Sequence, residues 1–243
     1  MNEKLTMRMQ VLPSMCDHTS TMGLESTVKL FMDIASVHAE QLGVGMTAMR
    51  EKKFFWLTAR TMVHIARRPR MLEPIEVVTW PMPVKEVRCV RQYEILSGDE
   101  PVVTGKTVWA ILDLETKKVL PAKGFFPAEL AMPEDDVCPQ PFARISKDFS
   151  DAQTIGTCPV RSTDIDLGGH MNNAAYVRAL LGCLPCAEQN AEAFTDLEIN
   201  YLTSCYEGDT LTFRRRQTDG AQEIGVFTQA VVPAALARLS RRG

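Results

Sequence analysis

Apolar residues recur along this chain with two different spacings, one typical of helices and one of strands. Over residues 21–42 they fall three and four positions apart, which predicts one amphipathic helix, and Gly43 is a natural stop for it. A second helix is predicted to begin after Asn172, a favourable N-cap residue, and to end or kink near Pro185.

Strand-like segments rich in Val, Ile, Thr and aromatic residues follow each helix, and polar turns such as Asp219-Gly220 separate them. One short strand also precedes each helix. The predicted strands are 5–12, 54–66, 75–80, 88–97 and 102–114 in the first half, and 155–160, 196–203, 210–216, 223–231 and 235–241 in the second. The order strand, helix, antiparallel strands therefore occurs twice.

Matching positions support a duplication. One fixed offset lays Asp17 on Asp166, and a shorter offset lays Val63 on Ile199, so the first copy has the longer helix-to-strand connection. A long helix wrapped by a curved antiparallel sheet is the hotdog arrangement. The predicted fold class is therefore α+β, a double hotdog with two long helices, each wrapped by its own curved antiparallel sheet.

Prolines mark the boundary between the two copies. They recur regularly in residues 115–150, where they exclude long helices and central strands. We therefore predict an N-terminal hotdog over 1–114, a Pro-rich linker over 115–150 that runs across the surface, and a C-terminal hotdog over 151–243. Two hotdogs in one chain already satisfy the usual pairing, and a homodimer of the whole chain stays an open alternative.

Composition narrows the function classes. The 243 residues carry a formal net charge of -3, which gives no basic surplus for nucleic acid, and no apolar run is long enough for membrane insertion. The start of the chain lacks the pattern of a signal peptide. Seven scattered cysteines favour a reducing, cytoplasmic location, and we expect the lone pair Cys183 and Cys186 to be buried packing residues, not metal ligands.

The most informative stretch is 161–176, at the end of a strand and the start of the second helix. A helix N-terminus favours negative charge, and Gly168 and Gly169 let the backbone approach a carbonyl closely. The backbone N–H groups of Gly169 and His170 are candidate donors to an oxyanion. Asp166 could orient or deprotonate a water, with His170 as base or donor, and Asn172 or Asn173 could hold that water.

Each of these residues also has an ordinary explanation. Asp-x-x-Gly is a good turn in any protein, and Asn172 fits a simple helix cap. Their combination inside a duplicated unit favours a site. The first copy carries Thr21 where the second has His170, and it has no glycine pair, so we expect the chemistry in the second copy. The chain contains no Gly-x-Ser-x-Gly elbow.

Several segments resemble the acyl-acyl carrier protein (acyl-ACP) thioesterase family over nearly the whole chain. The segments that carry the resemblance are 35–43 (ASVHAEQLG), 55–58 (FWLT), 78–81 (VTWP), 108–116 (VWAILDLET), 164–176 (DIDLGGHMNNAAY) and 199–209 (INYLTSCYEGD). The resemblance implies a double hotdog that hydrolyses acyl-ACP to free fatty acid. It implies ACP as partner and neither a metal nor an organic cofactor.

The family signature is Asp-x-Asn-x-His with a Glu on the following strand. The Asp falls on Asp166 and the His on His170, while Gly168 and Ser204 stand where the family has Asn and Glu. The resemblance then leaves Asn172 or Asn173 to supply the lost amide and Ser204 to hold a water. Cys205 matches a cysteine found in plastid relatives and is a further candidate.

Direct hydrolysis is the expected reaction, with the acyl chain held largely by the first copy. Two alternatives stay open: an acyl-CoA thioesterase on the same fold, and a non-catalytic acyl-binding hotdog protein. The arginines that could meet an acidic carrier protein are Arg67, Arg68, Arg70, Arg214, Arg215 and Arg216, although arginines alternating along a strand usually form a solvated face.

Overall fold

The computed structural model describes residues 3–190 and 193–241, so Met1 and Asn2 at the start of the chain lie outside it. Over this range the chain forms one continuous antiparallel sheet in the order β1-β3-β4-β5-β2-β8-β11-β10-β9-β7, with β6 added beside β5. The strands are β1 (Leu5–Gln10), β2 (Phe54–Ile65), β3 (Pro74–Pro81), β4 (Cys89–Ser97), β5 (Glu100–Asp113), β6 (Val119–Leu120), β7 (Gln153–Pro159), β8 (Asp196–Tyr201), β9 (Thr210–Thr218), β10 (Ala221–Phe227) and β11 (Pro233–Ser240).

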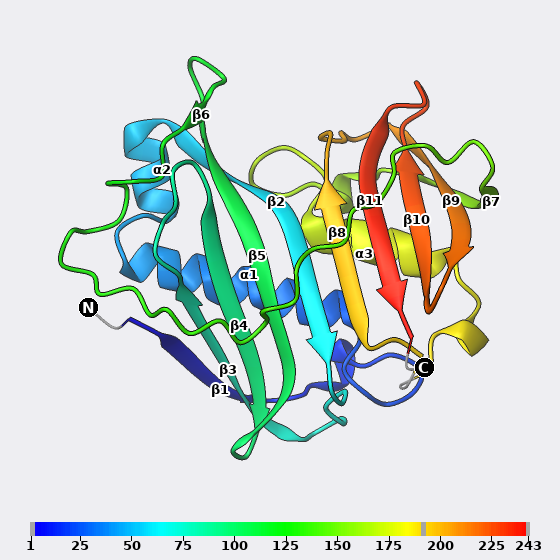
Figure 1. Cartoon of the computed structure of the whole chain (residues 1–243), viewed down its shortest axis with the longest axis horizontal. Coiled ribbons are helices and arrows are strands. Elements are labelled where there is room, and N and C mark those ends of the chain that lie inside the picture. The colour runs from blue at the N-terminus through cyan, green and yellow to red at the C-terminus, as the bar shows by residue number, and fades with distance from the viewer. Residues whose placement is uncertain (1–2, 191–192, 242–243) are drawn as a thin grey trace.

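The sheet is symmetric about its central pair. The first copy contributes β1-β3-β4-β5-β2 and the second contributes the matching series β7-β9-β10-β11-β8. Strands β2 and β8 pair from Arg60–Asn200 to His64–Asp196. The two helices α1 (Leu24–Gln41) and α3 (Asn173–Gly182) lie against the same face of this sheet (Figure 1). The predicted double hotdog is confirmed, except that the two predicted sheets are joined into one.

Local chemistry explains where the helices begin and end. The Asn172 side chain accepts a hydrogen bond from the Ala174 backbone N–H at 2.8 Å, as an N-cap should. Gly43 follows α1 with φ +72°, the left-handed conformation expected of a helix stop. Helix α3 ends at Gly182, before Pro185, and is shorter than α1. A third helix, α2 (Met46–Lys52), was not predicted because seven residues are too few for a clear periodicity.

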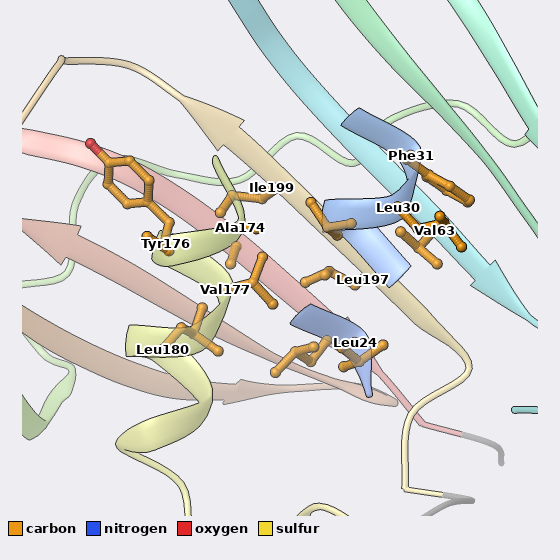
Figure 2. Close-up of a cluster of buried hydrophobic side chains, with 14 of the residues drawn as sticks. Leu24, Leu30, Phe31, Val63, Ala174, Tyr176, Val177, Leu180, Leu197 and Ile199 are labelled. Atoms are coloured by element: carbon orange, nitrogen blue, oxygen red, sulfur yellow. The ribbon is translucent and has the colours of Figure 1, made fainter. Parts of the chain in front are cut away.

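The two copies share one hydrophobic core. Leu24 and Phe31 of α1, Val177 of α3, and Leu197 and Ile199 of β8 all belong to one buried cluster. Figure 2 shows side chains of both helices converging above β8. Burial of these chains against one another holds the helices at fixed positions relative to the sheet.

The Pro-rich segment lies across the sheet face opposite the helices (Figure 1). Residues 121–152 contain no helix or strand. The Lys106 ammonium donates to the backbone oxygens of Cys138 and Gln140 at 2.6 Å each, and the backbone N–H of Ala143 donates to Glu198 at 2.6 Å. The segment therefore supplies hydrogen-bond partners to the Lys106 and Glu198 side chains, which are buried on this face.

No helix in the described part of the chain is both long and apolar enough to span a bilayer.

We predict that Gly105→Ala destabilises the fold by about 1–3 kcal/mol, because overpacking a tight core forces its neighbours apart. A Cβ on Gly105 would collide with the Phe31 ring and lie 2.7 Å from the Met62 backbone oxygen. Gly182→Ala is the matched control, because a Cβ there meets nothing within 4 Å. Urea unfolding should find the control at native stability or up to about 1 kcal/mol above it. Equal stabilities of the two variants would contradict this account of Gly105.

Candidate active site

A tight turn runs from Asp166 to His170, immediately before α3. The Asp166 N–H donates to the His170 oxygen at 2.9 Å, and the Gly169 N–H donates to the Asp166 oxygen at 3.0 Å. Gly169 has φ +76°, a conformation that glycine adopts without strain. The turn therefore brings Asp166, both glycines and His170 together, as the sequence predicts.

One carboxylate oxygen of Asp166 is fixed within the turn. Its Oδ1 accepts the Gly168 N–H at 2.8 Å, and the side chain is half-buried. Of the two predicted oxyanion donors, the Gly169 N–H is already used by the turn, whereas the His170 N–H has no acceptor among the described residues. The turn thus offers one backbone donor, the His170 N–H, beside the Asp166 carboxylate, whose second oxygen is not used by the turn.

Two aromatic residues flank the His170 ring. Its centroid lies 5.2 Å from that of Tyr206 and 6.5 Å from that of Phe55, which comes from β2 of the first copy. A Cβ on Gly168 would lie 2.5 Å from Phe55 Cζ, so the ring occupies the space that an asparagine side chain needs. Sequence reasoning did not select Phe55 or Tyr206, although both lie in segments that carry the family resemblance.

The other predicted residues surround this turn at different distances. Ser204 is exposed, and its neighbour Cys205 accepts the Met171 N–H on its backbone oxygen at 2.8 Å, which places Ser204 beside the turn. The side-chain oxygen of Asn172 caps α3. Asn173 points its amide toward Met32 of α1, with Nδ2 3.8 Å from Sδ. Both asparagine side chains therefore make contacts that support the structure, Asn172 as the cap of α3 and Asn173 against α1.

Cys205 is placed unfavourably for thiolate chemistry. The residue is fully buried, and desolvation raises the pKa of its thiol. Because the thiolate is the reactive form of cysteine, burial makes Cys205 a poor nucleophile.

The equivalent turn of the first copy has the same backbone. The Asp17 N–H donates to the Thr21 oxygen at 3.0 Å, and Asp17 Oδ1 accepts the Thr19 N–H at 2.9 Å. Ser20 has φ +58° at the position of Gly169. The two turns therefore have the same pattern of hydrogen bonds.

The difference lies in the ion pair that the first-copy carboxylate forms. Arg68 of the first copy occupies the position of Ser204, and its guanidinium forms an ion pair with Asp17 Oδ2. Burial is the largest single effect and raises the Asp17 pKa, but hydrogen bonds from Thr19 and Arg68 together outweigh it, so the net pKa is lowered. An ion-paired carboxylate with a lowered pKa is a weak proton acceptor.

Most of the arginines considered for a carrier-protein surface contact acidic groups of this chain. Arg67 pairs with Glu73, Arg215 with Glu188 and Arg216 with Glu223. These internal pairs reduce the positive charge available to a partner.

The two neighbouring cysteines differ in exposure. Cys183 is half-buried beside Gly156, but Cys186 is exposed, so the prediction of two buried packing residues was wrong for Cys186. Cys186 begins a short 3-10 helix (Cys186–Glu188) after α3, and none of its residues is buried. Within the part of the chain that the structure describes, no cluster of three or more His, Cys, Asp or Glu is arranged to hold a metal ion.

The two copies match two separate domain models of one known family. Residues 2–124 match the model of the acyl-ACP thioesterase N-terminal domain, and residues 148–231 match that of the C-terminal domain. An oleoyl-acyl carrier protein thioesterase of Arabidopsis thaliana is 24% identical over 79% of this chain and 58% of its own length. The corresponding Coriandrum sativum protein is 23% identical over 79% of this chain and 56% of its own length. The chain thus spans little more than half the length of these plant relatives.

Solved structures agree on the fold. An acyl-ACP thioesterase from Bacteroides thetaiotaomicron superposes with a TM-score of 0.83 at 19% identity, covering 98% of this chain and 97% of that one. A 12:0-ACP thioesterase from Umbellularia californica gives a TM-score of 0.83 at 16% identity, covering 100% and 98% of the two chains.

We predict that Arg68→Met lowers stability by about 2 kcal/mol at neutral pH, because it leaves the Asp17 carboxylate without its cation. The lowered Asp17 pKa means that this pair stabilises the fold above the unfolded pKa near 3.8, and that its contribution is lost as pH falls below it. The stability difference from native should therefore shrink at about pH 3. Urea unfolding at both pH values tests this, with the exposed Arg70→Met as control. A difference that is independent of pH would contradict the ion-pair explanation.

Proposed function

The chain belongs to the acyl-ACP thioesterase family, and from this premise we propose that it hydrolyses fatty acyl-ACP to free fatty acid and ACP in fatty acid biosynthesis. The observation that carries the proposal is the Asp166–His170 turn at the start of α3. Among the described residues the Asp166 carboxylate forms no ion pair and accepts the Gly168 N–H with one oxygen, whereas its counterpart Asp17 is tied to Arg68.

In the proposed reaction, the thioester carbonyl oxygen accepts the His170 backbone N–H at the positive end of α3. Water is held by the second oxygen of Asp166 and by the His170 imidazole, which take its proton as it attacks the carbonyl carbon. The tetrahedral intermediate then expels the carrier thiolate, which receives that proton. The products are a fatty acid and a free carrier thiol, and no cofactor is needed.

Supporting roles follow from the surroundings of the turn. Gly168 holds the Asp166 carboxylate through its N–H, and its lack of a side chain admits the Phe55 ring. We assign Ser204 to hold the attacking water, and the amide of Asn172 or Asn173 to replace the missing family asparagine. Cys205 takes no covalent role, because burial keeps its thiol protonated.

We propose that the first copy contributes acyl-chain binding and no chemistry. The Asp17 carboxylate of its turn is ion-paired with Arg68, and its strand β2 places Phe55 beside His170 of the reactive turn. A carrier-linked acyl group would then lie between α1 and the sheet of the first copy.

The carrier and the compartment complete the proposal. ACP is preferred over CoA as carrier because both halves of the chain match acyl-ACP thioesterase models. We propose a reducing compartment, the cytoplasm, because all seven cysteines are free thiols.

We expect Asp166→Asn to lower kcat for acyl-ACP hydrolysis by at least about 100-fold, because the amide cannot accept the proton of water. The matched control is Asp17→Asn, which changes the equivalent carboxylate of the first copy. The control should lose stability but keep kcat near native. Release of free thiol from purified acyl-ACP, with acyl-CoA in parallel, measures both variants. Absence of turnover by the native protein on either carrier would instead favour a non-catalytic acyl-binding protein.

Cys205→Ala should keep kcat near native and lower the melting temperature, because it removes a buried packing group and no reactive thiolate. Thiol release and thermal unfolding measure the two effects on the same preparation. A loss of kcat as large as that of Asp166→Asn would contradict the water-based mechanism and assign the chemistry to the thiol.

A further inference from the structure

Basic side chains gather at the edge of the first copy where β2 begins. Lys52 ends α2 and Lys53 follows it, while Lys117 and Lys118 lie in the turn between β5 and β6. All four are exposed. The two segments are joined by the Leu114 backbone N–H, which donates to the Lys53 oxygen at 2.9 Å. These four lysines form one surface, called the basic surface below.

The charge of this edge is opposite to that of the whole chain. Residues 50–53 and 113–118 hold five basic and three acidic side chains, a net charge of +2, whereas the 243 residues together carry -3. Lys53 forms an ion pair with Glu115. The other three members of the basic surface form no ion pair with the described residues, so their charges are available to an anionic partner.

The basic surface lies beside the reactive turn. Phe55 follows Lys53 by two residues, a step of about 7 Å along a strand. The Phe55 ring in turn lies against Gly168, where an added Cβ would be 2.5 Å from Cζ. Figure 1 shows α2 and the turn at β6 on the same edge of the sheet as the beginning of β2. A partner held by the basic surface would therefore sit next to Asp166.

The arginines of the first copy that were considered for a carrier-protein surface lie at the opposite end of β2. Arg67, Arg68 and Arg70 follow its last residue, and the 12 residues of β2 span roughly 40 Å. Arg68 is bound to Asp17, in the turn that we assign no chemistry. A partner held there would be too far from the reactive turn to present a thioester to it.

The reactive turn itself presents apolar side chains to solvent. Leu167, between Asp166 and Gly168, is 85% exposed, and Tyr206 beside the His170 ring is 53% exposed. The first copy has the polar His18 at the position of Leu167. Protein interfaces combine an apolar centre with a polar or charged rim, and Leu167 with the basic surface has this composition.

We propose that the basic surface is the docking site of the acidic carrier protein that brings the thioester to Asp166. This inference rests on the proposed function, which supplies the thioester. Carboxylates of the carrier would face the lysines, and the uncharged arm that bears the acyl group would pass Leu167 to reach the turn. Lysines at an interface rim act mainly by attracting an oppositely charged partner, so they govern how readily the carrier associates and leave the chemical step unchanged.

The test measures kcat and KM for acyl-ACP and for acyl-pantetheine, which presents the same thioester without the carrier protein. The docking variant removes three charges of the basic surface: Lys52→Gln, Lys117→Gln and Lys118→Gln. The matched control removes three charges from exposed residues elsewhere: Arg70→Gln, Arg144→Gln and Lys147→Gln. At low salt the docking variant should raise KM for acyl-ACP by about tenfold with kcat near native, and leave acyl-pantetheine unaffected. High salt should shrink the difference from native, because it screens exposed charges.

The control should stay near native on both substrates. A native KM for acyl-ACP in the docking variant, an equal rise in the control, or an equal loss on acyl-pantetheine would overturn the proposal. If the native protein hydrolyses neither thioester, the proposed function fails, and calorimetric titration with acyl-ACP decides the docking site separately. Weaker binding by the docking variant than by the control then supports the site, whereas equal binding or no binding overturns it.

Discussion

The backbone pairing of β2 with β8 is the contact on which the rest of the molecule depends. It joins two half-sheets into one and thereby sets α1 and α3 on a common face over a common core. At one end of this strand pair, His64 Nδ1 lies 2.7 Å from Asp196 Oδ1, and this contact reinforces the pairing. Because β2 is held against the second copy, Phe55 at its start reaches Gly168, and residues of both copies meet at one turn.

The duplicated turns separate scaffold from chemistry. Asp17 and Asp166 are held by the same pattern of backbone hydrogen bonds, so the backbone alone does not make a reactive carboxylate. The first copy has Arg68 at the position of Ser204 and its carboxylate is ion-paired, whereas Asp166 forms no ion pair among the described residues.

Much of this arrangement was predictable from local patterns. The spacing of Leu24, Phe31 and their neighbours predicted α1, and the Asn172 cap predicted the start of α3. The reactive turn was found because its residues are contiguous. Phe55 was not selected, because its significance comes from a contact with Gly168, far away in the sequence, that only the folded sheet creates. The joined sheet and the short α2 also depend on packing that local periodicity does not report.

The Pro-rich segment has a consequence for how this protein can evolve. In an assembly of two identical chains, every mutation appears in both partners, so a reactive turn and a binding core cannot be improved separately. Here 121–152 ties the two copies into one chain and packs against both halves of the sheet. The ratio of the two copies is thereby fixed at one to one, and each copy can accumulate its own substitutions without a mismatched pairing ever forming.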